Sequence, residues 1–182
     1  MPFKKNYQLL ILLFVLIAFA GFKNANNPVK KDGILWLTLE EAAAKSKIEP
    51  RKIVVDVYTD WCGWCKKMDK STFSDTKVVA YVNKNYYAVK LNAEGKEPIS
   101  INGKKYNYNA QYRAHEAAIA LLNGQMSYPT TVYLDEKMKI ISPIPGYLDV
   151  KDFQNILTFF GENFYKKQSY TDYTAGTPPP KN

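Results

Sequence analysis

Two cysteines, Cys62 and Cys65, stand three residues apart directly after an apolar, β-branched segment at 52–58, and the 182-residue chain has no others. At this spacing two thiols can close a small disulfide ring. If a helix begins at the pair, its unpaired amides and its dipole stabilise a thiolate there. The alternative is a structural disulfide, but a loop this short removes little entropy from the unfolded chain. The pattern therefore favours a redox-active dithiol.

The two thiols and one acid have distinct expected roles. Cys62 lies nearest the start of the helix and should be the more exposed thiol, so we expect it to be the nucleophile that forms a mixed disulfide. Cys65 then resolves that intermediate by attacking Cys62. Asp56 lies six residues before Cys62, inside the apolar strand. Burial should raise its pKa and let it accept the proton of Cys65; the alternative is a buried acid satisfied by hydrogen bonds alone.

Residues around the cysteines are expected to bind substrate. Trp61 and Trp64 shield the pair, with Gly63 between the cysteines, and offer an apolar surface to a polypeptide. Tyr128 and Pro129 directly precede another strand. A cis proline at that junction leaves the preceding backbone free to pair with an extended substrate segment.

The composition excludes several other functions. Two cysteines and a single histidine, His115, do not complete a tetrahedral zinc site, so we predict no metal and no cofactor besides the disulfide. We expect His115 on a solvated helix face and Asp60 in a solvated turn. The 25 basic and 17 acidic residues give a net charge of +8, which invites a nucleic-acid partner. No RNA-binding motif accompanies it, so we predict no such partner and interpret the charge as a surface property.

The N-terminus is typical of a secretory signal peptide. Lys4 and Lys5 precede an apolar run at 9–20 that ends in an Ala-Phe-Ala cleavage motif before Gly21. Because the run is shorter than a membrane-spanning helix, we expect cleavage; an uncleaved membrane anchor is the alternative. The expected organisation is a signal peptide (1–20), a flexible lead-in (21–33), one domain (34–168) and a disordered tail (169–182).

Hydrophobic patterning predicts an α/β domain. Thr38 and Glu41 form a capping box, and Asn102-Gly103 is typical of a hairpin turn. In chain order we expect a helix at 38–45, a strand at 52–58, helices from the cysteines to about 70 and at 75–83, a strand at 86–91, a hairpin at 99–106, a helix at 109–122, strands at 130–134 and 139–142, and a helix at 149–166. This order calls for a mixed sheet with helices on both faces.

Together these motifs resemble the thioredoxin superfamily: W-C-x-x-C-K after a strand, an acid six residues upstream, a proline before a later strand, and Gly146 before the last helix. Over about 34–164 the chain is similar to the thioredoxin-like domains of bacterial periplasmic thiol–disulfide interchange proteins, which share the Thr-Phe-Ser-Asp element found here at 72–75. The resemblance implies a thioredoxin fold with a nucleophile, a resolving thiol, a buried acid and a cis-proline at Cys62, Cys65, Asp56 and Pro129.

The chain departs from the thioredoxin pattern in two places. Between the cysteines stands Gly63-Trp64 rather than Gly-Pro, so thioredoxin's redox potential does not carry over. From Cys62 to Pro129 is 129 − 62 = 67 residues, more than in compact members, and the excess falls at 92–123. This hairpin-plus-helix insertion before the cis-proline strand either contacts a partner or covers a sheet edge.

The sequence therefore predicts an exported thiol–disulfide oxidoreductase, located in the periplasm, that reduces or isomerises protein disulfides through Cys62 and Cys65. Its expected partners are protein disulfide substrates and a membrane or periplasmic thiol electron donor, with a membrane tether only if the N-terminus stays uncleaved. The alternative is a redox-silent module that binds a partner through the surface around Pro129 and the insertion.

Overall fold

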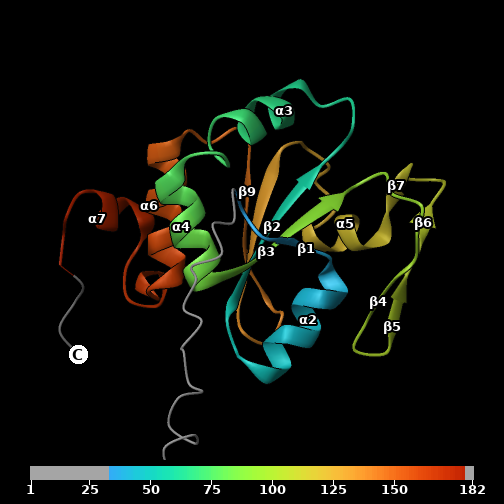
Figure 1. The fold of residues 1–182 in the computed structure, drawn as a ribbon, viewed down its shortest axis with the longest axis horizontal. Coiled ribbons are helices and arrows are strands. Elements are labelled where there is room, and N and C mark those ends of the chain that lie inside the picture. The colour runs from blue at the N-terminus through green and yellow to red at the C-terminus, as the bar shows by residue number, and fades with distance from the viewer. Residues whose placement is uncertain (1–32, 179–182) are drawn as a thin grey trace, which may run out of the picture. The chain divides into compact units, whose positions relative to one another are not determined.

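A five-stranded sheet forms the centre of the computed structural model, which describes residues 33–178 (Figure 1). The predicted signal peptide and nearly all of the lead-in lie outside the described residues. The strands run in the order β1-β3-β2-β8-β9. The first two pairs are parallel and the last two antiparallel, so the predicted mixed sheet is confirmed. The five strands are β1 (Trp36–Leu37), β2 (Lys52–Tyr58), β3 (Tyr86–Asn92), β8 (Thr130–Leu134) and β9 (Ile140–Pro145).

Helices cover both faces of the sheet, as predicted (Figure 1). Successive residues of a strand point to opposite faces, and β2 is apolar on both: Val54 packs with Met68 on one side, and Val55 packs with Leu121 on the other. Burial on both faces explains why this strand reads as a continuous apolar run. The first face is covered by α3 (Gly63–Lys70), α4 (Thr76–Asn85) and α6 (Val150–Gly161), and the second by α2 (Leu39–Ile48) and α5 (Glu116–Leu121).

Short polar side chains fix the starts of the helices. The hydroxyl of Thr38 accepts a hydrogen bond from the amide of Glu41, whose carboxylate accepts one from the amide of Thr38, so the predicted capping box is present. The side chains of Asp75 and Asp149 cap α4 and α6 by accepting hydrogen bonds from amides of the first turn, without the reciprocal bond. These caps satisfy amides that have no partner within the helix.

The predicted helix at 109–122 is wrong in its first half. The side chain of Asn109 accepts hydrogen bonds from the amides of Gln111 and Tyr112, which makes a local turn instead of a helical one. Arg113 then adopts a left-handed backbone with φ 51°. The segment forms two short paired strands, β6 (Tyr108–Asn109) and β7 (Ala114–His115), and α5 begins only after them. The predicted hairpin is present as β4 (Ile99–Ile101) and β5 (Lys104–Tyr106).

His115 is buried, with 1% of its surface exposed, so its expected place on a solvated helix face is wrong. It precedes α5 as the N-cap, and its Nδ1 accepts a hydrogen bond from the amide of Ala117 at 3.1 Å. Because Nδ1 accepts, Nε2 carries the hydrogen and donates to the carbonyl oxygen of Glu97 at 3.1 Å. The single histidine therefore ties the loop at Glu97 to the start of α5, within the insertion.

The C-terminal segment also differs from expectation. Helix α6 ends at Gly161 rather than continuing to residue 166, because Asn163 takes a left-handed conformation with φ 63°. A turn of 3₁₀ helix (Phe164–Lys166) follows.

Part of the tail that was expected to be disordered is helical. The hydroxyl of Ser169 accepts a hydrogen bond from the amide of Asp172 and caps α7 (Tyr170–Thr174). The ring of Tyr173 packs against those of Phe159 and Phe164, with centroids 5.3 and 5.0 Å apart. These aromatic contacts hold the short helix on the end of α6.

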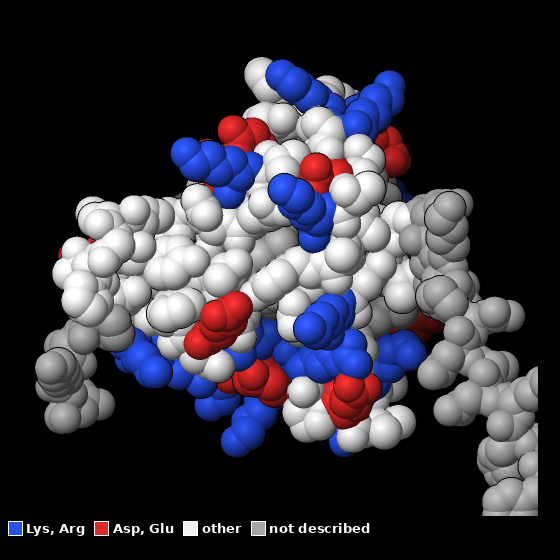
Figure 2. Space-filling model, turned by 60° about the vertical axis from the view of Figure 1, so that its left-hand side comes forward, with Lys and Arg blue, Asp and Glu red and all other residues white. Residues whose placement is uncertain are grey.

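Charged side chains of both signs lie on the face of the molecule that Figure 2 draws. On the face drawn in Figure 2, Lys and Arg are interspersed with Asp and Glu, and uncharged side chains fill a wide band between them. Among residues 33–178, no helix combines the length and the apolar character needed to cross a bilayer.

Replacing His115 by alanine is expected to lower the free energy of unfolding by about 2 kcal/mol or more, because the amide of Ala117 and the carbonyl of Glu97 lose their partner. His115→Asn keeps an acceptor suited to an N-cap and should lose less. Urea denaturation followed by tryptophan fluorescence measures both variants. Equal stability of His115→Ala and the wild type would contradict this role.

Candidate active site

Cys62 and Cys65 are joined by a disulfide at the start of α3, directly beyond the end of β2. Cys62 is the N-cap residue, and its sulfur accepts a hydrogen bond from the amide of Cys65 at 3.0 Å. Its own amide donates to the carbonyl of Thr59 at 3.1 Å. Both cysteines are buried in this form, with 4% and 2% of their surfaces exposed, so the expected difference in exposure is small. A helix amide is thus aimed at the sulfur that is predicted to be the nucleophile.

Trp61 is exposed beside the disulfide and is held by two neighbours. Its ring meets the edge of Tyr128, with centroids 5.9 Å apart, and its indole nitrogen donates to the carboxylate of Glu94 at 3.1 Å. Glu94 follows β3, so the indole joins this loop to the residue before Pro129. The structure brings Trp61 and Tyr128 together and adds Glu94, a residue that the sequence analysis did not identify.

Trp64 is exposed as well, but different residues hold it. Its ring packs on that of Tyr147, with centroids 5.4 Å apart, and the ammonium group of Lys67 lies 4.6 Å from the Trp64 ring and 5.1 Å from the Tyr147 ring. Such cation–π contacts stabilise an exposed aromatic ring modestly. Gly63 lies exposed between the two cysteines. Two aromatic surfaces, each fixed by a separate loop, therefore border the disulfide.

The peptide bond between Tyr128 and Pro129 is cis, as the resemblance implies. The carbonyl of Pro129 accepts a hydrogen bond from the amide of Gly146 at 2.8 Å, and Gly146 has φ +98°, a conformation that favours glycine. Within residues 33–178, the backbone of Tyr128 makes no hydrogen bond to another backbone group. The amide and carbonyl of Tyr128 are therefore available to hydrogen-bond with an extended peptide.

Asp56 is buried in β2, with 2% of its surface exposed. Its Oδ2 accepts a hydrogen bond from the ammonium group of Lys90 at 2.7 Å, and the two residues face each other in the parallel pairing of β2 with β3. Lys90 also forms an ion pair with Asp69 of α3. Asp56 shares its face of β2 with Val54, which packs with Met68 of α3. The carboxyl group therefore lies under the helix that carries Cys65.

Burial raises the pKa of Asp56, and the nearby ammonium group of Lys90 offsets this only in part. Burial alone would lower the pKa of Lys90, but the two carboxylates of Asp56 and Asp69 more than compensate and raise it. Lys90 therefore stays charged while Asp56 is brought closer to protonation. Within the described part of the chain, Asp56 Oδ1 and Thr131 Oγ1, from residues paired across β2 and β8, have no hydrogen-bond partner.

Sequence reasoning did not identify Lys90, Asp69, Lys67 or Tyr147. For Lys90 a signal exists: it is the one charged residue within the apolar run at 86–91, and parallel pairing of two central strands places it opposite Asp56. Asp60, expected in a solvated turn, is exposed and accepts a hydrogen bond from Asn92 at 3.0 Å. No group of three metal-ligating side chains occurs within residues 33–178.

A family model described as a thioredoxin-like domain matches residues 39–161, which include the disulfide, the buried acid and the cis-proline. The chain belongs to the thioredoxin-like family. Thiol:disulfide interchange protein DsbD of Pectobacterium atrosepticum is 28% identical over 124 residues, which is 67% of this chain and 18% of DsbD. DsbD of Yersinia enterocolitica is 31% identical over 83 residues, which is 41% of this chain and 14% of DsbD. The chain thus spans less than a fifth of the length of these relatives.

Solved structures share the fold. A thioredoxin-fold protein from Helicobacter pylori superimposes with a TM-score of 0.53 at 18% identity, covering 70% of this chain and 80% of that one. A DsbH oxidoreductase gives 0.53 at 16% identity, covering 79% and 95%. The predicted thioredoxin fold is therefore confirmed. A C-x-x-C disulfide within a thioredoxin-like domain indicates thiol–disulfide oxidoreductase chemistry.

The raised pKa of Asp56 predicts how stability depends on pH. An acid whose pKa is raised on folding favours the folded state below its unfolded pKa, and this contribution is lost as the pH rises through the folded value. Asp56→Asn removes that loss, so the stability of the variant relative to the wild type should increase from pH 4 to pH 8. The increase is about 1.4 kcal/mol for each unit by which the pKa is raised.

Urea denaturation at several pH values measures this difference. Asp69→Asn is the control, because it removes an exposed carboxylate from the same ammonium group and should give a much flatter pH profile. A fall in the stability of Asp56→Asn relative to the wild type as the pH rises would show that Lys90, and not burial, dominates the pKa of Asp56.

Proposed function

We propose that this protein is an exported enzyme that reduces or isomerises protein disulfides in the periplasm through the Cys62–Cys65 pair. The observation that carries the proposal is the disulfide in the first turn of α3, with a helix amide on Cys62 Sγ and a buried carboxyl group beneath the helix. The secretory pattern of the N-terminus and the similarity to part of DsbD support the location.

The first step is attack of the reduced protein on a substrate disulfide. The Cys62 thiolate forms a bond to one substrate sulfur, the substrate S–S bond breaks, and the other substrate sulfur leaves as a thiolate that takes up a proton. The amide of Cys65 and the dipole of α3 favour the thiolate form of Cys62. The exposed rings of Trp61 and Trp64 contact the polypeptide, and the free backbone of Tyr128 pairs with its extended segment.

The second step releases the substrate. Cys65 gives its proton to the Asp56 carboxylate and attacks Cys62 Sγ, the mixed disulfide breaks, and the second substrate sulfur leaves and is protonated. Two electrons have then passed from the cysteine pair to the substrate, and the pair is in the disulfide form seen here. A membrane or periplasmic thiol protein restores the dithiol. The raised pKa of Asp56 suits it to exchange a proton with a thiol.

Cys65→Ala is expected to trap the mixed disulfide, because Cys62 can still attack but nothing resolves the product. Incubation with a disulfide-containing protein should give an adduct on non-reducing gels that dithiothreitol removes. Cys62→Ser is the matched control and should give no adduct. Absence of an adduct with Cys65→Ala, together with equal insulin reduction by the wild type and Cys62→Ser, would favour the redox-silent binding module.

Trp61→Ala and Trp64→Ala should each raise KM for a protein disulfide substrate about fivefold, the effect of losing roughly 1 kcal/mol of contact energy. The rate with a small disulfide such as hydroxyethyl disulfide should change little, since that substrate does not reach the aromatic surface. Tyr112→Ala removes a comparably exposed ring outside the proposed surface and serves as the control. Equal losses with both substrates would assign the tryptophans to the cysteine chemistry instead.

A further inference from the structure

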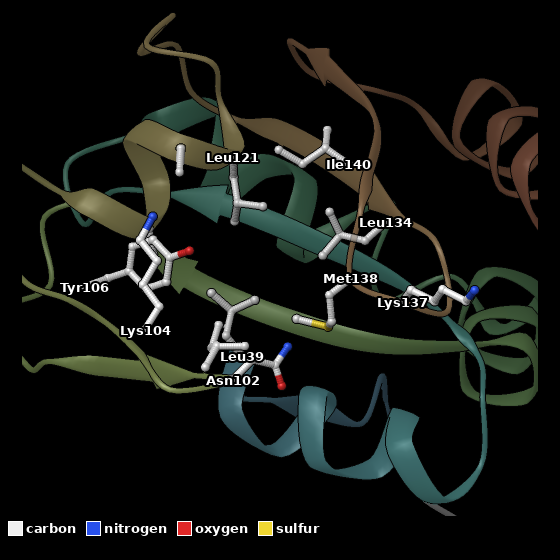
Figure 3. Close-up of a pocket in the computed structure, with 12 residues that line it drawn as sticks. Leu39, Asn102, Lys104, Tyr106, Leu121, Leu134, Lys137, Met138 and Ile140 are labelled. Carbon is white, nitrogen blue, oxygen red and sulfur yellow. The ribbon is translucent and has the colours of Figure 1, made fainter.

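A second candidate site lies at the other end of the sheet from the disulfide. A cavity of about 340 Å³ opens between α2, the β4–β5 hairpin, α5 and the β8–β9 turn (Figure 3). Leu134, which lines it, pairs with Ile53 at the start of β2, whereas Cys62 follows the end of that strand. The cavity is therefore separate from the proposed redox site, and an inference drawn from it does not depend on redox activity.

The interior of the cavity is apolar. Leu39 comes from α2, Leu121 from α5, Leu134 and Ile140 from the strands, and Met138 from the turn between those strands (Figure 3). The volume lies within the range of sites for small organic molecules, which are mostly apolar with a few polar groups that fix orientation. A flexible methionine among branched side chains also lets the wall adapt to an occupant.

The rim of the cavity is positively charged. In Figure 3, Lys104 of the hairpin and Lys137 of the turn lie at opposite ends of the set of lining side chains, and no Asp or Glu is among the residues that line this cavity. Both lysines are exposed, and within residues 33–178 neither forms an ion pair. The ammonium group of Lys104 lies 4.6 Å from the centre of the Tyr106 ring. The lining of this apolar cavity therefore carries two lysines and no acidic side chain.

We propose that this cavity binds an amphiphile with an alkyl chain and an anionic head group, of the chemical class of a fatty acid. The chain removes the apolar lining from water, and the head group pairs with Lys104 or Lys137. A neutral alkyl compound would leave both ammonium groups unpaired. A small inorganic anion would leave the apolar lining exposed to water. The combination of an apolar interior and a cationic rim thus selects this class.

The test uses the full-length chain with ¹³C-methyl-labelled methionine and sodium laurate below its critical micelle concentration. Met138 reports from the cavity, and Met68, fully buried beneath α3, reports on the remainder of the core. Laurate should shift the Met138 methyl resonance saturably and leave that of Met68 unchanged. Dodecyl maltoside and dodecyltrimethylammonium, which carry the same chain on a neutral and a cationic head, should bind at least tenfold more weakly.

Variants separate the charge from the apolar interior. Lys104→Gln and Lys137→Gln should each weaken laurate binding roughly threefold, as expected for a partly exposed ion pair, and the double variant roughly tenfold. Lys151→Gln, an exposed lysine of α6, is the matched control and should bind like the wild type. Ala120→Trp adds bulk at an exposed position of the lining and should abolish the Met138 shift.

Three results would overturn the proposal. The first is equal affinity for laurate and dodecyl maltoside, which would show that the rim does not select an anion. The second is unchanged laurate affinity in the double lysine variant. The third is a parallel shift of Met68 and Met138, which would show a general, detergent-like effect on the core.

Discussion

Strand β2 is paired on both edges and covered by helices on both faces, and the geometry of the candidate active site depends on this confinement. Its residues from Lys52 to Val57 are buried, so a charged side chain within it depends on partners from the protein. Asp56 is the acid held in this position, and Cys62 lies just beyond the strand, at the first turn of α3. A fully enclosed strand thus sets both the environment of the acid and the position of the disulfide.

Burial of a carboxylate costs free energy unless a cation compensates it. Here a single ammonium group, that of Lys90, is shared between the buried Asp56 and the exposed Asp69. Sharing keeps Lys90 charged but leaves the compensation of Asp56 incomplete, so its pKa remains raised. A fully paired acid would hold its negative charge more firmly and accept a proton less readily. The mechanism that we propose uses this incomplete ion pair, because it leaves Asp56 able to take up a proton.

Features encoded within a few residues were predictable from the sequence. The capping box at Thr38, the Asn102-Gly103 turn and the enclosed strand at 52–58 follow from local chemistry, and so does the spacing of Cys62 and Cys65. Features that join distant segments were not. Lys90 becomes part of the site only through the pairing of β2 with β3. His115 can be buried because the carbonyl of Glu97 accepts its hydrogen bond. Helix α7 is held in place because the ring of Tyr173 packs against Phe159 of α6. The error at 109–122 was different, because an asparagine turn overrode an alanine-rich pattern that favours a helix.

The segment at 92–123 was expected either to contact a partner or to cover a sheet edge. Its two halves differ in how they pack on the sheet. Helix α5 is core structure: Ala117, Ala118 and Leu121 are buried against the sheet, so this part cannot leave without exposing β2. The β4–β5 hairpin has exposed lysines and joins the domain mainly through its apolar side and a hydrogen bond from the amide of Ser100 to Glu40. It therefore stands as the outer wall of a cavity whose inner wall is the core, an arrangement that allows a binding function to be added without altering the end of β2 that carries the disulfide.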